Sequence, residues 1–167
     1  MMTATLVFAL LTAQASPVAG ALDPRTPEAI AVMAPVDAVF AGLAARDGAL
    51  LRPHVDPAAR VMAMVRRADG SSRVVAPTWE QFVSNLKPGP ERFEEIMVDP
   101  TIAVDGDVAM VWGEYIFRVD DAISHCGVNH FDLVRRDDVW QIVNLTWSQR
   151  STGCEDIAAR INSQAER

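Results

Sequence analysis

The residues best suited to chemistry gather in the last third of the chain. The run HCGVNHFDLVRRDDVWQIVNLTW, residues 125–147, places two histidines, two asparagines and two tryptophans in a stretch that otherwise alternates like a β-strand. Glu114 precedes it in a stretch of the same kind. Because burial raises the pKa of a carboxyl group toward the range where histidine titrates, Glu114 and His125 could form a general acid–base pair. They could also orient a ligand by hydrogen bonds, or form a buried ion pair.

Hairpin register decides which side chains share a face with these two residues. Two Asp-Asp dipeptides read as two-residue turns, and the register they set pairs Phe131 with Asn144 and Ile116 with His125. A slip of one residue would exchange the two faces of the sheet. A pocket needs aromatic walls and a few polar groups, although the asparagines could instead form a cross-strand polar ladder. The predicted pocket face carries Trp112, Glu114, His125, Asn129, Phe131 and Asn144, with Trp79 completing the wall.

The opposite face of the predicted sheet is largely apolar. Val111, Phe117, Val143 and Trp147 lie at its centre, and Tyr115 is predicted to point to the same side, away from the pocket. Such a patch is larger than a soluble monomer usually exposes, so we expect a homodimer to cover it. The alternative is that helices or the carboxyl-terminal tail cover this face.

Capping and turn residues predict the first half of the fold. Thr26 caps a first helix, which Pro35 kinks or shortens. The turn at residues 68–71 predicts a β-hairpin, and Thr78 with Gln81 forms the capping box of a second helix.

From Glu91 onward the apolar pattern changes to a period of two. Pro100 cannot donate a backbone hydrogen bond, so it predicts a bulge in the first strand of this half. The order of elements predicts an α+β fold in which helices cover one face of a curved sheet. The four expected strands are residues 92–104, 108–119, 123–136 and 139–149, followed by a polar tail that is frayed or a short helix.

Two stretches resemble the nuclear transport factor 2-like superfamily, which includes the SnoaL-like polyketide cyclases and the ketosteroid isomerases. They are VDPTIAVDGDVAMVWGEYIFRV and FDLVRRDDVWQIVNLTWSQRSTGC. The resemblance covers residues 27–154 and implies a cone-shaped, curved antiparallel or mixed sheet with helices on its concave face. It also implies a pocket inside the cone and a convex face that often forms a dimer. Because this fold carries enzymes, binding domains and assembly modules alike, the resemblance is weak for activity.

Three functions are compatible with this resemblance. The favoured one is an exported domain that binds a small molecule. The second is a SnoaL-type cyclase or dehydratase that uses Glu114 or His125 as its acid–base residue, and the third is a dimerisation module with a collapsed cavity. The isomerase mechanism does not carry over, because it needs a tyrosine and an aspartate in the cavity and Tyr115 is predicted to point away.

The amino terminus predicts export. The apolar run at residues 6–11 is too short to span a bilayer and precedes two A-x-A sites ending at Ala15 and Ala21, although no Lys or Arg precedes it. We expect a signal peptide at residues 1–21, cleaved after Ala21 or Ala15, and a single mature domain at residues 22–167 in the periplasm or outside the cell. No contact with the membrane is expected after cleavage.

Charge and cysteine spacing restrict the partners. A formal net charge of −7 without a basic stripe argues against nucleic acid, and the His and Cys spacings match no metal site, so no metal or cofactor is expected. In an exported chain the two cysteines favour a disulfide. The register places Cys126 opposite Gln149, and residues 151–153 can return Cys154 toward it. The alternative is two buried thiols that never meet.

Overall fold

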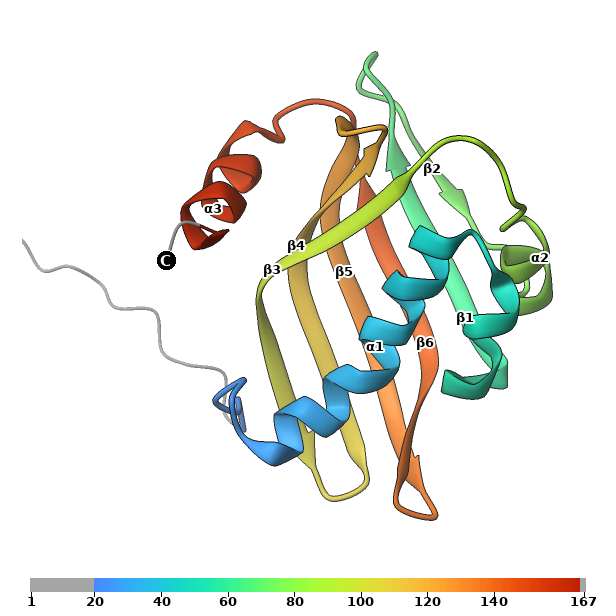
Figure 1. Cartoon of the computed structure of the whole chain (residues 1–167), viewed down its shortest axis with the longest axis vertical. Helices are drawn as coiled ribbons and strands as arrows, with labels where there is room; N and C mark the ends of the chain where they lie inside the picture. The colour runs from blue at the N-terminus through green and yellow to red at the C-terminus, as the bar shows by residue number, and fades with distance from the viewer. Residues whose placement is uncertain (1–19, 166–167) are drawn as a thin grey trace, which may run out of the picture.

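The computed structural model describes residues 20–165, so most of the predicted signal peptide lies outside the described residues. The helices are α1 (Pro27–Ala45), α2 (Trp79–Ser84) and α3 (Glu155–Ala165), with short 3-10 turns η1 (Gly48–Leu50) and η2 (Arg52–His54) after α1 (Figure 1). The strands are β1 (Val55–Arg66), β2 (Ser72–Val75), β3 (Phe93–Asp105), β4 (Val108–Val119), β5 (Ala122–Arg136) and β6 (Val139–Gln149).

The strands form one mixed sheet in the order β2-β1-β6-β5-β4-β3. β1 and β6 are parallel, and every other neighbouring pair is antiparallel. The sheet is open and α1 crosses one of its faces (Figure 1). We call the face toward α1 the inner face and the opposite face the outer face. The predicted α+β class is confirmed, as are the predicted bounds of β4 and β6.

α1 is the helix that covers the inner face. The side chain of Thr26 accepts a hydrogen bond from the backbone N–H of Ala29, and the helix then runs from Pro27 through Pro35 without a break. It is long and apolar enough to cross a membrane by composition alone. Its buried residues nevertheless pack against the sheet as a core helix: Ala29, Val32, Val36 and Val39.

Local signals in the sequence are reproduced in the first half of the chain. Thr78 and Gln81 form the capping box at the start of α2. β1 and β2 form the expected hairpin. In β3 the register with β4 shifts between Val98 and Thr101, which confirms the bulge predicted at Pro100.

The predicted hairpin register is wrong beyond each turn, although both turns have the predicted length. All four turn aspartates, at 120–121 and 137–138, have positive φ angles, as two-residue type I′ turns require. One extra residue then interrupts each strand pair: Ser124 in β5 and Val143 in β6. Bulges of this kind bend and twist a strand, and they curve this sheet around α1.

The bulges exchange side chains between the two faces of the sheet. His125 lies opposite Phe117 instead of Ile116, and Phe131 lies opposite Leu145 instead of Asn144. Four residues predicted on the face opposite the pocket are therefore on the inner face: Val111, Tyr115, Phe117 and Trp147. Three residues predicted for the pocket face are on the outer face: Trp112, Glu114 and Asn144.

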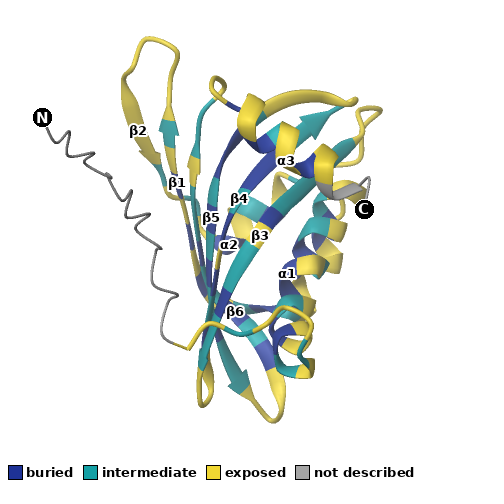
Figure 2. Ribbon diagram, turned by 90° about the vertical axis from the view of Figure 1, so that its left-hand side faces the viewer, coloured by how far each residue is buried: buried dark blue, intermediate teal, exposed yellow. Residues whose placement is uncertain are grey.

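Apolar residues form two cores. The larger lies between α1, α2 and the inner face of the sheet, where buried residues follow the middle of the strands (Figure 2). The smaller lies on the outer face, where Ile157 and Ile161 of α3 pack against Val98, Ile116 and the disulfide. The residues at the centre of the expected dimer interface were therefore placed wrongly: Val111, Phe117 and Trp147 are on the inner face, toward α1. α3 covers part of the outer face.

The predicted disulfide joins Cys126 of β5 to Cys154, directly before α3, with 5.7 Å between the Cα atoms. Cys126 forms a bridge with Arg150, one residue beyond the partner expected from the sequence. The return of the chain through Gly153, with φ of 69°, brings Cys154 back over the strand end. The disulfide therefore attaches α3 to the outer face of the sheet.

Candidate functional site

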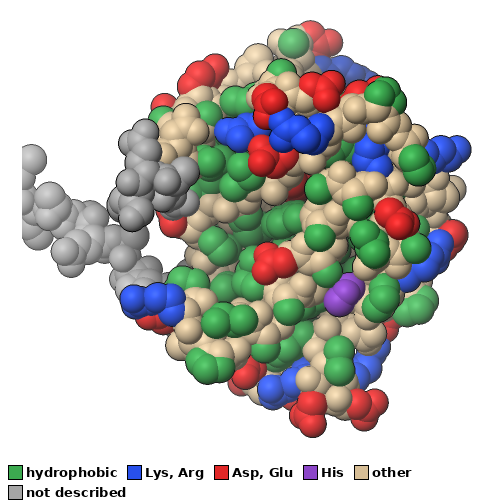
Figure 3. Space-filling model, viewed as in Figure 1, with side chains coloured by type: hydrophobic (Ala, Val, Ile, Leu, Met, Phe, Trp, Pro, Cys, Tyr) green, Lys and Arg blue, Asp and Glu red, His purple; other side chains and the backbone are tan. Residues whose placement is uncertain are grey.

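A cavity of about 170 Å³ lies between α1 and the inner face of the sheet. The front of the molecule is hollowed here, with hydrophobic side chains on the floor of the hollow (Figure 3). The walls come from α1, α2 and strands β3 to β6. They comprise Val39, Phe40, Leu43, Phe82, Glu95, Tyr115, Phe117, His125, Asn129, Phe131, Leu145, Trp147 and Gln149.

Glu95 of β3 is the acidic residue of this cavity. Its carboxylate Oε1 accepts a hydrogen bond of 2.6 Å from Nδ2 of Asn129, which is buried on β5. Burial among protein atoms raises the pKa of Glu95 to about 7, against the smaller opposing effect of the Asn129 hydrogen bond. Glu95 is nevertheless only partly buried, because its side chain borders the open cavity. Glu95 is thus a carboxyl group that can gain or lose a proton near neutral pH.

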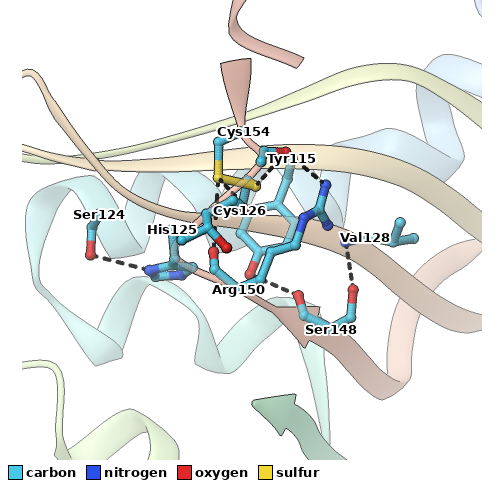
Figure 4. Close-up of a disulfide and its surroundings, with 10 residues drawn as sticks. Tyr115, Ser124, His125, Cys126, Val128, Ser148, Arg150 and Cys154 are labelled. Atoms are coloured by element: carbon cyan, nitrogen blue, oxygen red, sulfur yellow. Dashed lines mark hydrogen bonds between the residues drawn. A yellow bond between two sulfur atoms is a disulfide. The ribbon is translucent and has the colours of Figure 1, made fainter. Parts of the chain in front are cut away.

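His125 is the second titratable group in the wall (Figure 4). Its ring stacks on Phe117, with 4.9 Å between ring centroids, and Nδ1 lies 3.2 Å from the hydroxyl of Ser124. Burial lowers the pKa of His125 to about 4. The imidazole is therefore neutral at pH 7 and can donate or accept a hydrogen bond without carrying a charge.

Tyr115 is held by the backbone of β6. Its hydroxyl donates a hydrogen bond of 3.1 Å to the carbonyl of Ser148 (Figure 4). Tyr115 lies opposite Gly127, whose missing side chain leaves room for the Ser148 backbone. Burial and the nearby Glu95 carboxylate raise the pKa of Tyr115 above its usual value. Tyr115 is therefore a neutral, fixed wall of the cavity.

Charge is distributed unevenly in the cavity. No Lys or Arg belongs to its walls as the structure describes them, and His125 is neutral at pH 7. Asn129 is the only hydrogen-bond partner of the Glu95 carboxylate among residues 20–165. Within the same residues, no three His, Cys, Asp or Glu side chains come together in a way that could hold a metal ion.

Solved structures with a similar fold share its architecture. An NTF2-like protein of unknown function from Shewanella baltica aligns with a TM-score of 0.55 and 16% identity, over 74% of this chain and 94% of that one. This chain has the nuclear transport factor 2-like (NTF2-like) fold. No family model matches the sequence, and no curated protein matches it either.

Two other structures with this fold show how widely its described roles range. One is from Streptomyces avermitilis and is provisionally described as a dehydratase of the NTF2-like family; its TM-score is 0.56 at 15% identity, over 75% of this chain and 99% of that one. The other, from Xanthomonas campestris, is provisionally described as a calcium/calmodulin dependent protein kinase II association domain. Its TM-score is 0.55 at 21% identity, over 83% of this chain and 99% of that one. At these identities the likeness concerns the fold alone.

The NTF2-like fold brings together only some of the residues proposed from the sequence. His125, Asn129 and Phe131 line the cavity. Glu114 forms an ion pair with Arg160 of α3 on the outer face, so it cannot form a pair with His125 through the sheet. The remaining proposed residues lie elsewhere: Trp112 is exposed on the outer face, Asn144 bonds to Asp132 there, and Trp79 is buried in the core against Phe82.

Sequence reasoning missed Glu95 and misplaced Tyr115. Glu94 and Glu95 are adjacent, so one of them had to face inward, but the bulge at Pro100 hides which one. The position of Tyr115 depended on the unrecognised bulge at Ser124. With Tyr115 facing the cavity, the reason given above for setting aside an isomerase-like arrangement no longer holds for that residue. The cavity wall nevertheless contains no aspartate among the described residues.

Proposed function

We propose that the protein is an exported domain of NTF2-like fold that binds a small, mainly apolar molecule in the cavity bordered by Glu95 and Asn129. The observation that carries this proposal is a hydrogen-bonded carboxyl group set in an open, mainly aromatic cavity. Ligand pockets combine apolar walls with a few placed polar groups in this way. A carboxyl group with a pKa shifted by burial is also typical of functional sites.

The size of the cavity supports binding over a collapsed dimerisation module. An engineered apolar cavity of about 150 Å³ accommodates benzene. The cavity of this protein is about 170 Å³ and opens to the surface, so a molecule with a single ring fits. A module without a ligand would gain stability by filling this space, because empty volume in a core is costly.

Native mass spectrometry of protein purified from its own host tests this proposal. We expect a retained small molecule in the wild type. Leu43→Trp fills the cavity from α1 and should abolish retention, whereas Ile30→Trp, on the exposed side of the same helix, should not. Equal retention by both variants, or no ligand together with no binding of benzyl alcohol at millimolar concentration, would contradict the proposal.

An acid–base enzyme of cyclase or dehydratase type is the second candidate. The observation that favours it is the pKa of Glu95, about 7, next to a cavity that a substrate can enter. In this candidate Glu95 takes the role first assigned to Glu114 or His125, and His125 contributes a neutral hydrogen bond. Exchange of the α-protons of a small cyclic ketone in D₂O, followed by NMR, tests it. The rate should fall at least about 100-fold in Glu95→Gln, and no catalysed exchange in the wild type would count against it.

Export is supported by the predicted leader and by the disulfide. Disulfides persist in oxidising compartments, so the Cys126–Cys154 bond is compatible with the periplasm or the cell exterior. Amino-terminal sequencing of the native protein should find a chain that begins at Leu22 or Ser16. A soluble cytosolic protein that retains Met1 or Met2 would contradict export.

A homodimer remains our proposal for the part of the outer face that α3 leaves open. One row of paired residues crosses four strands there, from Met62 on β1 through Thr146 and His130 to Trp112 on β4. Its two ends are apolar and exposed, Trp112 at 48% and Met62 at 41%. Sedimentation at micromolar concentration should give twice the chain mass. Trp112→Glu should give a monomer, whereas Ile30→Glu, also exposed but on α1 at the inner side of the sheet, should not. A monomeric wild type would contradict the proposal.

A further inference from the structure

Within residues 20–165, the Glu95 carboxylate has no positively charged partner. Buried carboxylates in proteins are normally paired with a cation, because an isolated charge is costly to remove from water. Elsewhere in the described chain, Glu94 pairs with Arg118 and Glu114 with Arg160. Glu95 instead has one neutral partner, Asn129, and its charge raises the pKa of the neighbouring Tyr115. The cavity thus offers a carboxylate with which a positively charged ligand could pair.

The aromatic walls favour the same kind of ligand. Phe40, Phe82, Phe117, Phe131, Tyr115 and Trp147 contribute rings to the cavity. The face of an aromatic ring carries partial negative charge and attracts a cation within about 6 Å of its centre. A cavity of about 170 Å³ keeps any occupant close to several of these rings. Aromatic side chains around a binding site recognise quaternary ammonium groups in other proteins.

We propose that the ligand of this cavity is a small organic cation, an amine with one ring or an equivalent branched apolar group, whose ammonium group pairs with Glu95. The inference rests on the proposed function, since it names the chemical class of ligand for the same cavity. Asn129 holds one carboxylate oxygen and leaves the carboxylate oriented for the ammonium group. The apolar part of the ligand occupies the space among the rings. An anionic ligand is disfavoured, because the residues described in the walls include no Lys or Arg and carry the Glu95 charge.

Binding of a cation should be coupled to ionisation of Glu95. The titratable groups facing Glu95 are Tyr115 on β4 and His125 on β5, while α1 and α2 contribute apolar walls. Arg150 acts on Tyr115, where its charge lowers the pKa against the larger effect of burial. Tyr115 and His125 both stay neutral between pH 6 and pH 8, so of these three groups only Glu95 changes charge there. Because the cation binds the ionised carboxylate, affinity should rise about tenfold from pH 6 to pH 8.

Three probes with the same ring separate charge from shape: benzylammonium, benzyl alcohol and benzoate. Each is titrated into the full mature protein by isothermal calorimetry or NMR at pH 8. We expect benzylammonium to bind at least about tenfold more tightly than benzyl alcohol, and benzoate to bind most weakly. Glu95→Gln keeps the shape and the Asn129 contact and should remove the preference for the ammonium probe. Glu94→Gln, one residue away and paired with Arg118, should retain it.

The outcomes distinguish this inference from the proposed function. If benzyl alcohol binds and benzylammonium binds no better, the cation inference is wrong and the binding cavity stands. If the preference survives in Glu95→Gln, or if affinity for benzylammonium does not change with pH in the wild type, the inference is also overturned. If no probe binds at millimolar concentration and Leu43→Trp behaves like the wild type, both proposals fail.

Discussion

The two faces of strands β4 and β5 use neighbouring residues in opposite ways. On the outer face, Ile116 and Cys126 are fully buried beneath α3, and the disulfide closes that contact. On the inner face, the adjacent residues Tyr115 and His125 line a cavity that stays open. On each of the two strands, neighbouring residues thus belong to different environments: one lies in a closed core and the next in the wall of a cavity.

The two faces also differ in how their glutamate side chains are paired and buried. Glu114 on the outer face is half-exposed and paired with Arg160. Exposed ion pairs of this kind change the free energy of unfolding by less than about 1 kcal/mol. Glu95 on the inner face pairs with no Lys or Arg of the described chain, and its pKa is about 7 because burial penalises its charge. Carboxyl groups with perturbed pKa values gather at functional sites, so the difference supports the role proposed for Glu95 and a structural role for Glu114.

Gly127→Ala should give the largest effect, because it breaks the inner wall itself. A Cβ atom at residue 127 would lie 1.8 Å from the Ser148 carbonyl oxygen, and backbone cannot move aside cheaply. We expect a loss of about 3 kcal/mol or more in the free energy of unfolding, measured by urea denaturation. Gly113→Ala is the matched control, because its Cβ would meet mainly the flexible Met97 side chain, and it should cost about 1 kcal/mol. Equal losses would show that the close approach at Ser148 is relaxed in solution.

Removing the disulfide should destabilise the outer face and spare the cavity. The cysteines are 28 residues apart, so closing this loop stabilises the fold by about 3 kcal/mol in the entropic account. Reduction, or the double variant Cys126→Ala with Cys154→Ala, should lower the free energy of unfolding by that amount and change benzyl alcohol affinity less than about twofold. The unreduced, denatured protein should contain no free thiol. A parallel loss of affinity would show that the two faces are coupled.

The fold was predictable because its signals are local. Asp-rich turns separate strands with clear alternation, so the bounds of β4 and β6 follow from the sequence. The face to which each side chain points was harder to predict. A bulge adds one residue to a strand and so exchanges the faces of the residues beyond it, and the amino-acid composition of the strand does not reveal it. β6 does carry a sign of its bulge, since the apolar pattern moves from Trp140 and Ile142 to Leu145 and Trp147.

The candidate site was only partly predictable for the same reason. β4 has large apolar residues in both phases, for example Ile116 and Phe117, so nothing in its own sequence marks the bulge opposite it at Ser124. Glu95 became visible only when β3, β4 and β5 were assembled, since its partner Asn129 is 34 residues away. The disulfide was predictable because it depends on the strand end rather than on which face each residue occupies.

Glu95→Gln should make the protein more stable at high pH. The folded-state pKa of about 7 lies above the ordinary value of 4.5, so the folded protein binds more protons than the unfolded chain between these values. The free energy of unfolding of the wild type therefore falls as pH rises through this window, by about 2–3 kcal/mol. The variant lacks this loss and should be more stable by that amount at pH 8 and nearly equal at pH 4.5. His125 titrates in both proteins and cancels in the comparison. Parallel pH profiles from urea denaturation would contradict the burial of Glu95.

Glu114→Gln should give the smallest effect, and it tests whether this carboxylate belongs to the outer face. Glu114 and Glu95 are both glutamates on adjacent strands, and the change to glutamine removes the same charge from each. Because the pair with Arg160 is largely in water, its loss should cost less than 1 kcal/mol and be weaker still in high salt. Arg160→Gln should cost a similar amount, and the double variant no more than either alone. Probe affinity and its pH dependence should match the wild type, whereas both change in Glu95→Gln. A loss of probe binding in Glu114→Gln would return Glu114 to the cavity and remove the distinction between the two faces.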